Sequence, residues 1–78
     1  MPQFFMHVRE GDQVTEDPDG SELPDLTAAK AEAVAAACEI TAEDLRAGKA
    51  PVARRFEIRD GAGRMLATVP FPEVSNSP

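Results

Sequence analysis

The sequence predicts an α+β fold in two layers, an antiparallel sheet formed in the order β-β-α-β-β with one long helix packed on one face. Apolar and polar residues alternate over residues 3–9, an alanine-rich run with helical periodicity covers residues 26–47, and a second alternating segment with a hairpin signal covers residues 54–69. The chain has 78 residues, enough for one domain. We expect this domain to span residues 1–72 and to be followed by a disordered tail at residues 73–78.

The first strand is expected at residues 3–9, where successive side chains point to opposite faces of a sheet. One face carries Phe4, Met6 and Val8, and the other carries Phe5, His7 and Arg9. A turn at Gly11-Asp12 is expected to lead into a short second strand at residues 13–16, where Val14 and Thr15 are β-branched.

An acidic stretch, DPDGSELPD, occupies residues 17–25 and suggests two interpretations, a cation-binding loop or a turn that leads into a helix. Its first four residues match the preferences of a type I turn, and Asp25 stands where a carboxylate caps a helix. Aligned with a calcium-binding EF-hand loop, the first ligand position falls on Thr15 and the last on Leu26, where calcium requires a glutamate. We therefore interpret the stretch as a turn and a helix cap, and predict no metal site.

One helix is expected over residues 26–47, because this run is rich in strong helix formers. Its apolar stripe consists of Leu26, Ala29, Ala33, Ala36, Ala37 and Ile40. A flank about a quarter-turn away carries Val34, Cys38 and Leu45. Because alanine side chains are small, the sheet must supply the bulk of the core, and the candidates are Phe4, Met6, Phe56, Ile58, Leu66 and Phe71. Asp44 falls within the apolar stripe, so we expect the helix to be kinked or frayed near Thr41, where a capping pattern begins.

The C-terminal hairpin is expected from RRFEIR at residues 54–59, followed by the turn signal DGAG. One strand face carries Phe56 and Ile58, and the other carries Arg55, Glu57 and Arg59. A three-residue loop with Gly63 in the left-handed conformation places Leu66 opposite Ile58 and Thr68 opposite Phe56. Pro70 ends the return strand or places it at a sheet edge.

Short motifs follow one another through these elements in a fixed order. They are Phe4-Phe5, Gly11-Asp12, Glu22-Leu23-Pro24-Asp25, Ala29-x-x-Glu32-Ala33, Ala42-Glu43-Asp44-Leu45, Asp60-x-x-Gly63-Arg64 and Val69-Pro70-Phe71. Through these motifs, residues 2–72 resemble DUF6894, a family of small bacterial proteins, mostly alphaproteobacterial, classed as a domain of unknown function. The resemblance implies a stand-alone cytoplasmic protein and supplies no activity, cofactor or catalytic residue.

Charge is unevenly distributed along the chain, whose net charge is −6. Residues 1–45 hold eleven acids against two bases, a balance of −9, whereas residues 46–78 hold six bases against three acids, a balance of +3. We interpret this asymmetry as attraction between the two halves in the fold; the alternative is a basic face within an acidic total. No apolar run approaches the roughly 20 residues that cross a bilayer, and the N-terminus lacks the pattern of a signal peptide. With Cys38 as the only cysteine, a cytoplasmic location without membrane contact is predicted.

Catalysis is not expected from this composition. His7 is the only histidine, and Cys38 lies among alanines, where we expect a buried thiol that behaves as a small apolar group. No nucleotide-binding or metal-binding helix motif is present. We therefore predict that the chain is not an enzyme and has no cofactor.

The expected interaction face consists of Phe5, His7, Arg9, Val14, Arg55, Glu57 and Arg59. We interpret the chain as a protein-interaction or regulatory module that self-associates as a homodimer, through a sheet edge or through this open face. Domains of this size bury a small core and often gain stability from a partner. The alternative is binding of RNA or single-stranded nucleic acid through Arg9, Arg55 and Arg59 beside an aromatic ring, which the net negative charge disfavours.

Overall fold

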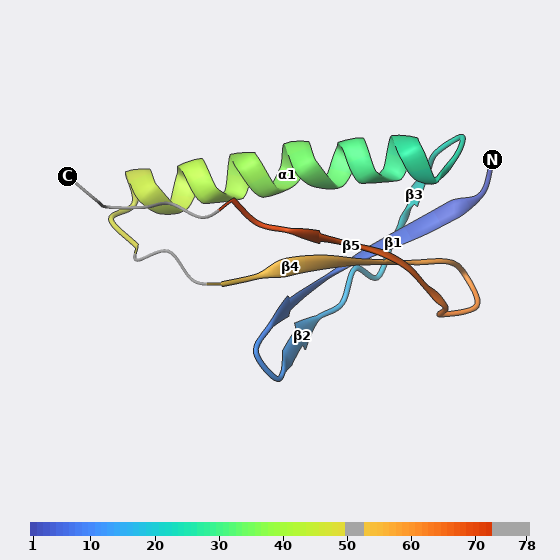
Figure 1. Ribbon diagram of the computed structural model, residues 1–78, viewed down its shortest axis with the longest axis horizontal. Coiled ribbons are helices and arrows are strands. Elements are labelled where there is room, and N and C mark those ends of the chain that lie inside the picture. The colour runs from blue at the N-terminus through green and yellow to red at the C-terminus, as the bar shows by residue number, and fades with distance from the viewer. Residues whose placement is uncertain (50–52, 73–78) are drawn as a thin grey trace.

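The computed structural model describes residues 1–49 and 53–72. The predicted α+β architecture is confirmed: an antiparallel sheet of five strands packs against one helix (Figure 1). The elements are β1 (Gln3–Glu10), β2 (Gln13–Thr15), β3 (Ser21–Glu22), α1 (Leu26–Arg46), β4 (Arg55–Arg59) and β5 (Met65–Pro70). Four strands follow the order β2-β1-β4-β5, and the short β3 pairs with the start of β1. The expected C-terminal tail, residues 73–78, lies outside the described residues.

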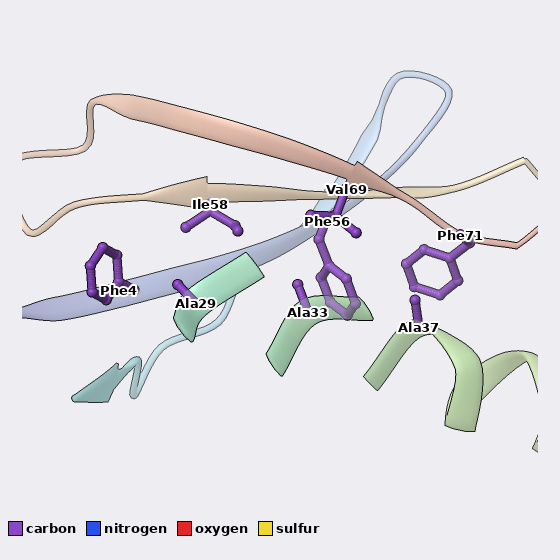
Figure 2. Close-up of a cluster of buried hydrophobic side chains, with 8 residues drawn as sticks. All are labelled: Phe4, Ala29, Ala33, Ala37, Phe56, Ile58, Val69 and Phe71. Atoms are coloured by element: carbon purple, nitrogen blue, oxygen red, sulfur yellow. The ribbon is translucent and has the colours of Figure 1, made fainter. Parts of the chain in front are cut away.

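The helix packs on β4 and β5 through an alanine stripe, as the sequence predicts (Figure 1). Ala29, Ala33 and Ala37 are buried, with at most 1% of each residue exposed. Their side chains point at the large apolar side chains of the sheet (Figure 2). The buried core residues are Phe4, Ala29, Ala33, Ala37, Phe56, Ile58, Val69 and Phe71. Small residues on the helix thus permit a close approach, and the sheet fills the space between the two layers.

The helix runs without a break through Thr41, so the predicted kink or fraying is wrong. The Thr41 hydroxyl donates to the Ala37 carbonyl at 2.8 Å and is satisfied within the helix rather than as a new cap. Asp44 fits the apolar side of α1 because its carboxylate accepts a hydrogen bond from Arg54 at 2.5 Å. At the other end, Asp25 caps α1 as expected, since its side chain accepts from the Ala28 N–H at 2.8 Å.

The acidic stretch forms a turn that is fastened to β1. The Asp17 carboxylate accepts from the Gly20 N–H at 3.2 Å and from the Met6 N–H at 3.3 Å. Gly20 has a positive φ of 69°, and a Cβ there would lie 2.9 Å from an atom of the Phe5 ring. A larger residue at this position is therefore excluded both by the backbone conformation and by the contact with β1.

The predicted register of the C-terminal hairpin is wrong beyond its first pair. Arg59 is the partner of Met65, but Ile58 is the partner of Ala67, so Leu66 is an extra residue that forms a bulge in β5. The bulge moves the rest of β5 by one position, which brings Val69 opposite Phe56. Val69 consequently joins the core, whereas Leu66, predicted to be in the core, is exposed.

Candidate functional site

The structure gathers the residues of the expected interaction face on the side of the sheet that α1 leaves uncovered, which we call the open face. Three pairs of directly opposite residues connect β1 to β4: Phe5 with Arg59, His7 with Glu57, and Arg9 with Arg55. Val14 on β2 lies opposite Arg9 on the other side of β1. Opposite residues in an antiparallel sheet share a face, so the predicted grouping is present. Its role as an interaction face stays a prediction.

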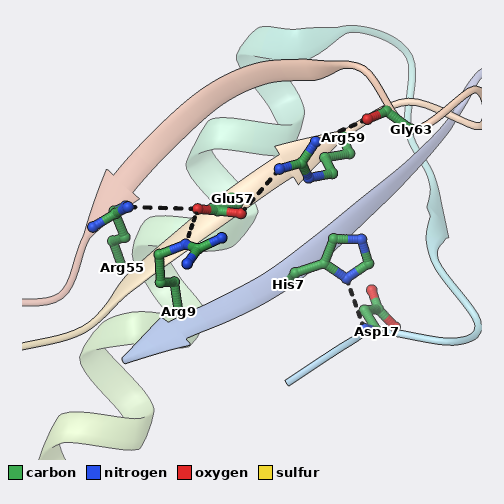
Figure 3. A network of polar contacts seen from close by, with 7 residues as sticks. All are labelled: His7, Arg9, Asp17, Arg55, Glu57, Arg59 and Gly63. Carbon is green, nitrogen blue, oxygen red and sulfur yellow. Dashed lines mark hydrogen bonds and ion pairs between the residues drawn. The ribbon is translucent and has the colours of Figure 1, made fainter. Parts of the chain in front are cut away.

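Glu57 is the centre of the open face and is 2% exposed. Its carboxylate accepts hydrogen bonds from Arg9 Nε at 2.5 Å and from Arg59 Nη2 at 3.2 Å, and Arg55 Nη2 lies 3.6 Å away (Figure 3). The hydrogen bond from Arg9 lowers the pKa of Glu57 below its ordinary value; burial opposes this effect, and Arg59 adds to it. A buried carboxylate of this kind is tolerated because it is paired and hydrogen-bonded.

The three arginines differ in how many donors they use on the protein. Arg59 uses two, since its Nη1 also donates to the Gly63 carbonyl at 2.8 Å. Arg9 uses only Nε, and its side chain is 28% exposed. Arg55 is 49% exposed, and within the described residues its contact with Glu57 is an ion pair without a hydrogen bond. Three guanidinium groups around one carboxylate leave an excess of positive charge on this face.

His7 is engaged structurally on the open face. Its Nδ1 accepts the backbone N–H of Asp17 at 2.9 Å, and its ring stacks with Phe5 at a centroid distance of 6.4 Å. Cys38 is exposed on α1, so the prediction of a buried thiol is wrong. Its position on the helix turns it away from the alanine stripe. Because α1 covers the opposite face of the sheet, His7 and Cys38 lie on different sides of the molecule and do not form a nucleophile and base.

A second group of exposed apolar side chains lies along α1 and the edge strand β5, with Met65 on the open face as the partner of Arg59. Six large apolar side chains are exposed among the described residues, and four of them belong to these two elements: Val34, Leu45, Met65 and Leu66. The exposure of Met65 and Leu66 on β5 was not predicted from the sequence, because the bulge that turns Leu66 outward has no sequence signal. Leu45 lines a shallow hollow with Phe71 and Pro72, which continue β5, so this flank of the helix faces the β5 side.

The hollow at the C-terminal end of α1 offers little room for chemistry. Its volume is about 260 Å³ with open solvent included, and Arg54 and Asp44 in its wall already bind each other. The Arg54 guanidinium also lies 4.8 Å from the centroid of the Phe71 ring. These contacts hold the end of α1 against the start of β4 and the end of β5.

The expected attraction between the two halves of the chain is seen in part. Within residues 1–49 and 53–72, two of the five ion pairs join the halves, Arg9–Glu57 and Arg54–Asp44. Arg55, Arg59 and Arg64 pair with acids of their own half. The seven acids between residues 10 and 25 form no ion pair in the part of the chain that the structure describes.

Comparison with known proteins gives one match. Residues 3–72 match the model of a domain of unknown function, DUF6894. No match is found among curated proteins, and no solved structure matches the chain. None of the helices in the described residues is both long and apolar enough to cross a membrane. The matched range contains all six elements of the fold and both surfaces described above.

Proposed function

Because the chain belongs to DUF6894, a family of domains of unknown function, we propose its function from its own surfaces: it is a protein-interaction module that self-associates and acts by binding rather than by catalysis. A regulatory role would follow from such binding. The bacterial source and the cytoplasmic location stay predictions, the first from the family resemblance and the second from the lone cysteine.

The observation that carries the proposal is the position of the exposed apolar side chains. Val34 and Leu45 lie within about 20° of each other around α1 at 100° per residue, on the flank that faces β5. Leu66 and Met65 lie on β5 itself, which is an edge strand. Exposed apolar groups along a strand edge that is unpaired within the described residues favour contact with another chain.

A second copy of the chain fits this side of the molecule. If two β5 strands pair antiparallel about a twofold axis, they lie about 4.8 Å apart. Each α1 packs on β4 and β5, so its axis lies roughly one strand spacing from the twofold axis, and the two helices come about 10 Å apart. That is a normal distance for packed helices, about 8–10 Å. The strand edge and the helix flank would therefore be covered together.

In the proposed dimer, the hydrogen-bonding pattern of β5 favours a twofold axis at Thr68. The Phe71 N–H donates to the Arg54 carbonyl at 2.9 Å. Because bonding alternates along an antiparallel ladder, Thr68 and Pro70 direct their backbone groups away from β4. Pro70 has no N–H, so Thr68 is the residue of this pair with both a free donor and a free acceptor. Reciprocal Thr68 bonds between the two copies put the axis at Thr68, and apolar contacts supply the rest of the interface.

Light scattering on a sizing column tests self-association. The parent chain has a mass of 8.4 kDa, and we expect a particle of twice that mass. Val34→Glu places a charge in the proposed interface and should shift the particle to the mass of one chain. Val14→Glu is the matched control, because Val14 is also exposed but lies on the opposite edge strand, β2. A parent particle of single-chain mass at all concentrations, or equal responses from both variants, would contradict the proposal.

Nucleic-acid binding is the second candidate, and the excess of arginine on the open face favours it. Arg9, Arg55 and Arg59 lie on the same face as the Phe5 ring, which is a combination that binds single-stranded nucleic acid in other sheets. Against it stands the acidic segment at residues 10–25, which runs next to this face. A phosphate chain that extends beyond the arginines would be repelled there.

A further inference from the structure

We infer that Arg9 and Arg55 on the open face form a binding site for the carboxylate of an acidic segment in a partner protein. This site is separate from the proposed self-association surface, because the open face points away from α1 and neither arginine belongs to β5. The inference goes beyond the proposed function by naming the chemistry of the partner.

The placement of the two arginines is the first observation. Arg9 and Arg55 are directly opposite each other on β1 and β4, where Cβ atoms are about 5 Å apart. Two like charges in this position repel each other and destabilise a sheet. Glu57 Oε2 compensates both of them, at 2.5 Å from Arg9 and 3.6 Å from Arg55. Its other oxygen is taken by Arg59, so one carboxylate oxygen serves two guanidinium groups and leaves them with a net positive charge.

The free donors are the second observation. Within the described residues, the terminal nitrogens of Arg9 make no hydrogen bond, and Arg55 makes none through its guanidinium nitrogens. Guanidinium groups bind planar carboxylates through two parallel N–H donors, and such bonds are stronger than neutral ones. A second carboxylate, supplied from outside, would occupy these donors and remove the remaining repulsion between Arg9 and Arg55.

The site is also held in position before a ligand arrives. Arg9 is fixed by its bond to the buried Glu57, so little of its side-chain freedom is lost on binding. Figure 3 shows Arg9 and Arg55 on the same side of Glu57, with α1 behind the sheet. The Arg55 side chain is half exposed, and that of Arg9 is 28% exposed. The ligand can therefore approach from solvent across the open face.

Charge complementarity favours a protein carboxylate over a nucleic-acid backbone. The excess positive charge lies where Arg9 on β1 is paired with Arg55 on β4. Two acids, Glu10 and Asp12, come soon after Arg9 along the chain. A short peptide in which acids alternate with apolar residues places its charge on the arginines and its apolar side chains near Phe5 and Val14, which lie on this face. A phosphate at every nucleotide would also meet the acids of the neighbouring turn.

Fluorescence anisotropy with labelled peptides tests the site on the full chain. The probe is a six-residue extended peptide in which glutamate alternates with valine, compared with the same peptide carrying glutamine in place of glutamate. We expect the glutamate peptide to bind at least tenfold more tightly at low salt, since hydrogen bonds between charged groups are the strongest in this setting. Equal affinities, or no binding by either peptide at millimolar concentration, would overturn the inference.

Two substitutions locate the binding. Arg55→Gln should lower the affinity for the glutamate peptide about tenfold or more. Arg55→Lys should recover only part of this affinity, because lysine lacks the planar pair of donors. Arg64→Gln is the matched control, since it removes the same charge from a side chain that is 80% exposed on the hairpin, away from Glu57. An equal loss of peptide affinity in Arg64→Gln would mean that overall charge governs binding, and it would contradict a site at Arg9 and Arg55.

A third probe separates the peptide from nucleic acid. Oligouridine of six nucleotides should bind more weakly than the glutamate peptide. If the RNA binds more tightly than the glutamate peptide and this binding is lost in Arg55→Gln, the inference is overturned in favour of nucleic-acid binding. Val34→Glu, which is designed to break the dimer, should bind the peptide with unchanged affinity. Self-association and carboxylate binding can therefore fail independently of each other.

Discussion

The two faces of the sheet are stabilised in different ways, although the same strands supply both. On the covered face, small residues of α1 pack against Phe56, Ile58 and Val69, and packing density decides which side chains fit. On the open face, a single buried acid, Glu57, organises three arginines. The covered face is therefore stabilised by close packing, whereas the open face carries a charge network in which some guanidinium donors have no acceptor among the described residues.

The largest expected effect is on the covered face. Ala33 is fully buried between α1 and the sheet, so Ala33→Leu forces the two layers apart and should lower the free energy of unfolding by about 3 kcal/mol. Urea denaturation followed by circular dichroism measures the change. Ala35→Leu is the matched control, because Ala35 lies two residues away on the same helix and is exposed. A similar loss in both variants would mean that α1 does not pack through its alanine stripe.

A smaller effect is expected at the centre of the open face. Glu57→Gln keeps the size of the side chain but removes the charge that holds Arg9 and Arg59, and it should lower the free energy of unfolding by about 2 kcal/mol at neutral pH. The exposed Glu39 on α1 provides the control Glu39→Gln, which should change stability by less than about 0.5 kcal/mol.

The same substitution has a defined pH dependence. The folded pKa of Glu57 lies below its ordinary value of 4.5, with the Arg9 hydrogen bond as the main cause. The stability that Glu57 contributes is therefore complete above its unfolded pKa and is lost as the pH falls through the lower folded pKa. Denaturation at a series of pH values should show the parent chain and Glu57→Gln converging as the solution is acidified. A constant gap between them would contradict the ion-pair network.

The smallest of these effects is expected at the edge of the open face. His7→Ala leaves the Asp17 N–H without its acceptor and should cost about 1 kcal/mol. His7→Asn offers a side-chain oxygen near the position of Nδ1 and should recover part of that loss. Thermal unfolding of the parent chain, His7→Ala and His7→Asn measures the order of their stabilities. Equal stability of the alanine and asparagine variants would show that the hydrogen bond contributes nothing.

The sequence predicted the covered face better than the open one. A period of two in β1 and β4 and a helical period in α1 were sufficient to place Phe4, Ile58 and the buried alanines. The register of β5 was not predictable, because the bulge at Leu66 arises from how the hairpin closes rather than from a residue preference. Strand order was equally open, since several arrangements of short antiparallel strands satisfy the same pattern.

The candidate site was predicted as a group of residues but not as a network. Alternation placed Arg9, Arg55, Glu57 and Arg59 on one face, and the structure agrees. The burial of Glu57 was missed, because a glutamate on an uncovered strand face is normally solvated. Three arginine side chains surround its carboxylate and pair with it (Figure 3). Asp17, which fastens the acidic turn to β1, was also missed as a partner of His7, since that contact joins the middle of β1 to the loop between β2 and β3.

We propose that Arg9 and Arg55 on the open face serve binding more than stability, and Arg55→Gln tests this most directly. One preparation of this variant is measured for glutamate-peptide affinity and for free energy of unfolding. Because Arg55 is half exposed and makes no hydrogen bond to Glu57, we expect peptide affinity to fall about tenfold or more and unfolding free energy to change by less than about 0.5 kcal/mol. Unchanged affinity together with a stability loss as large as that of Ala33→Leu would contradict the account.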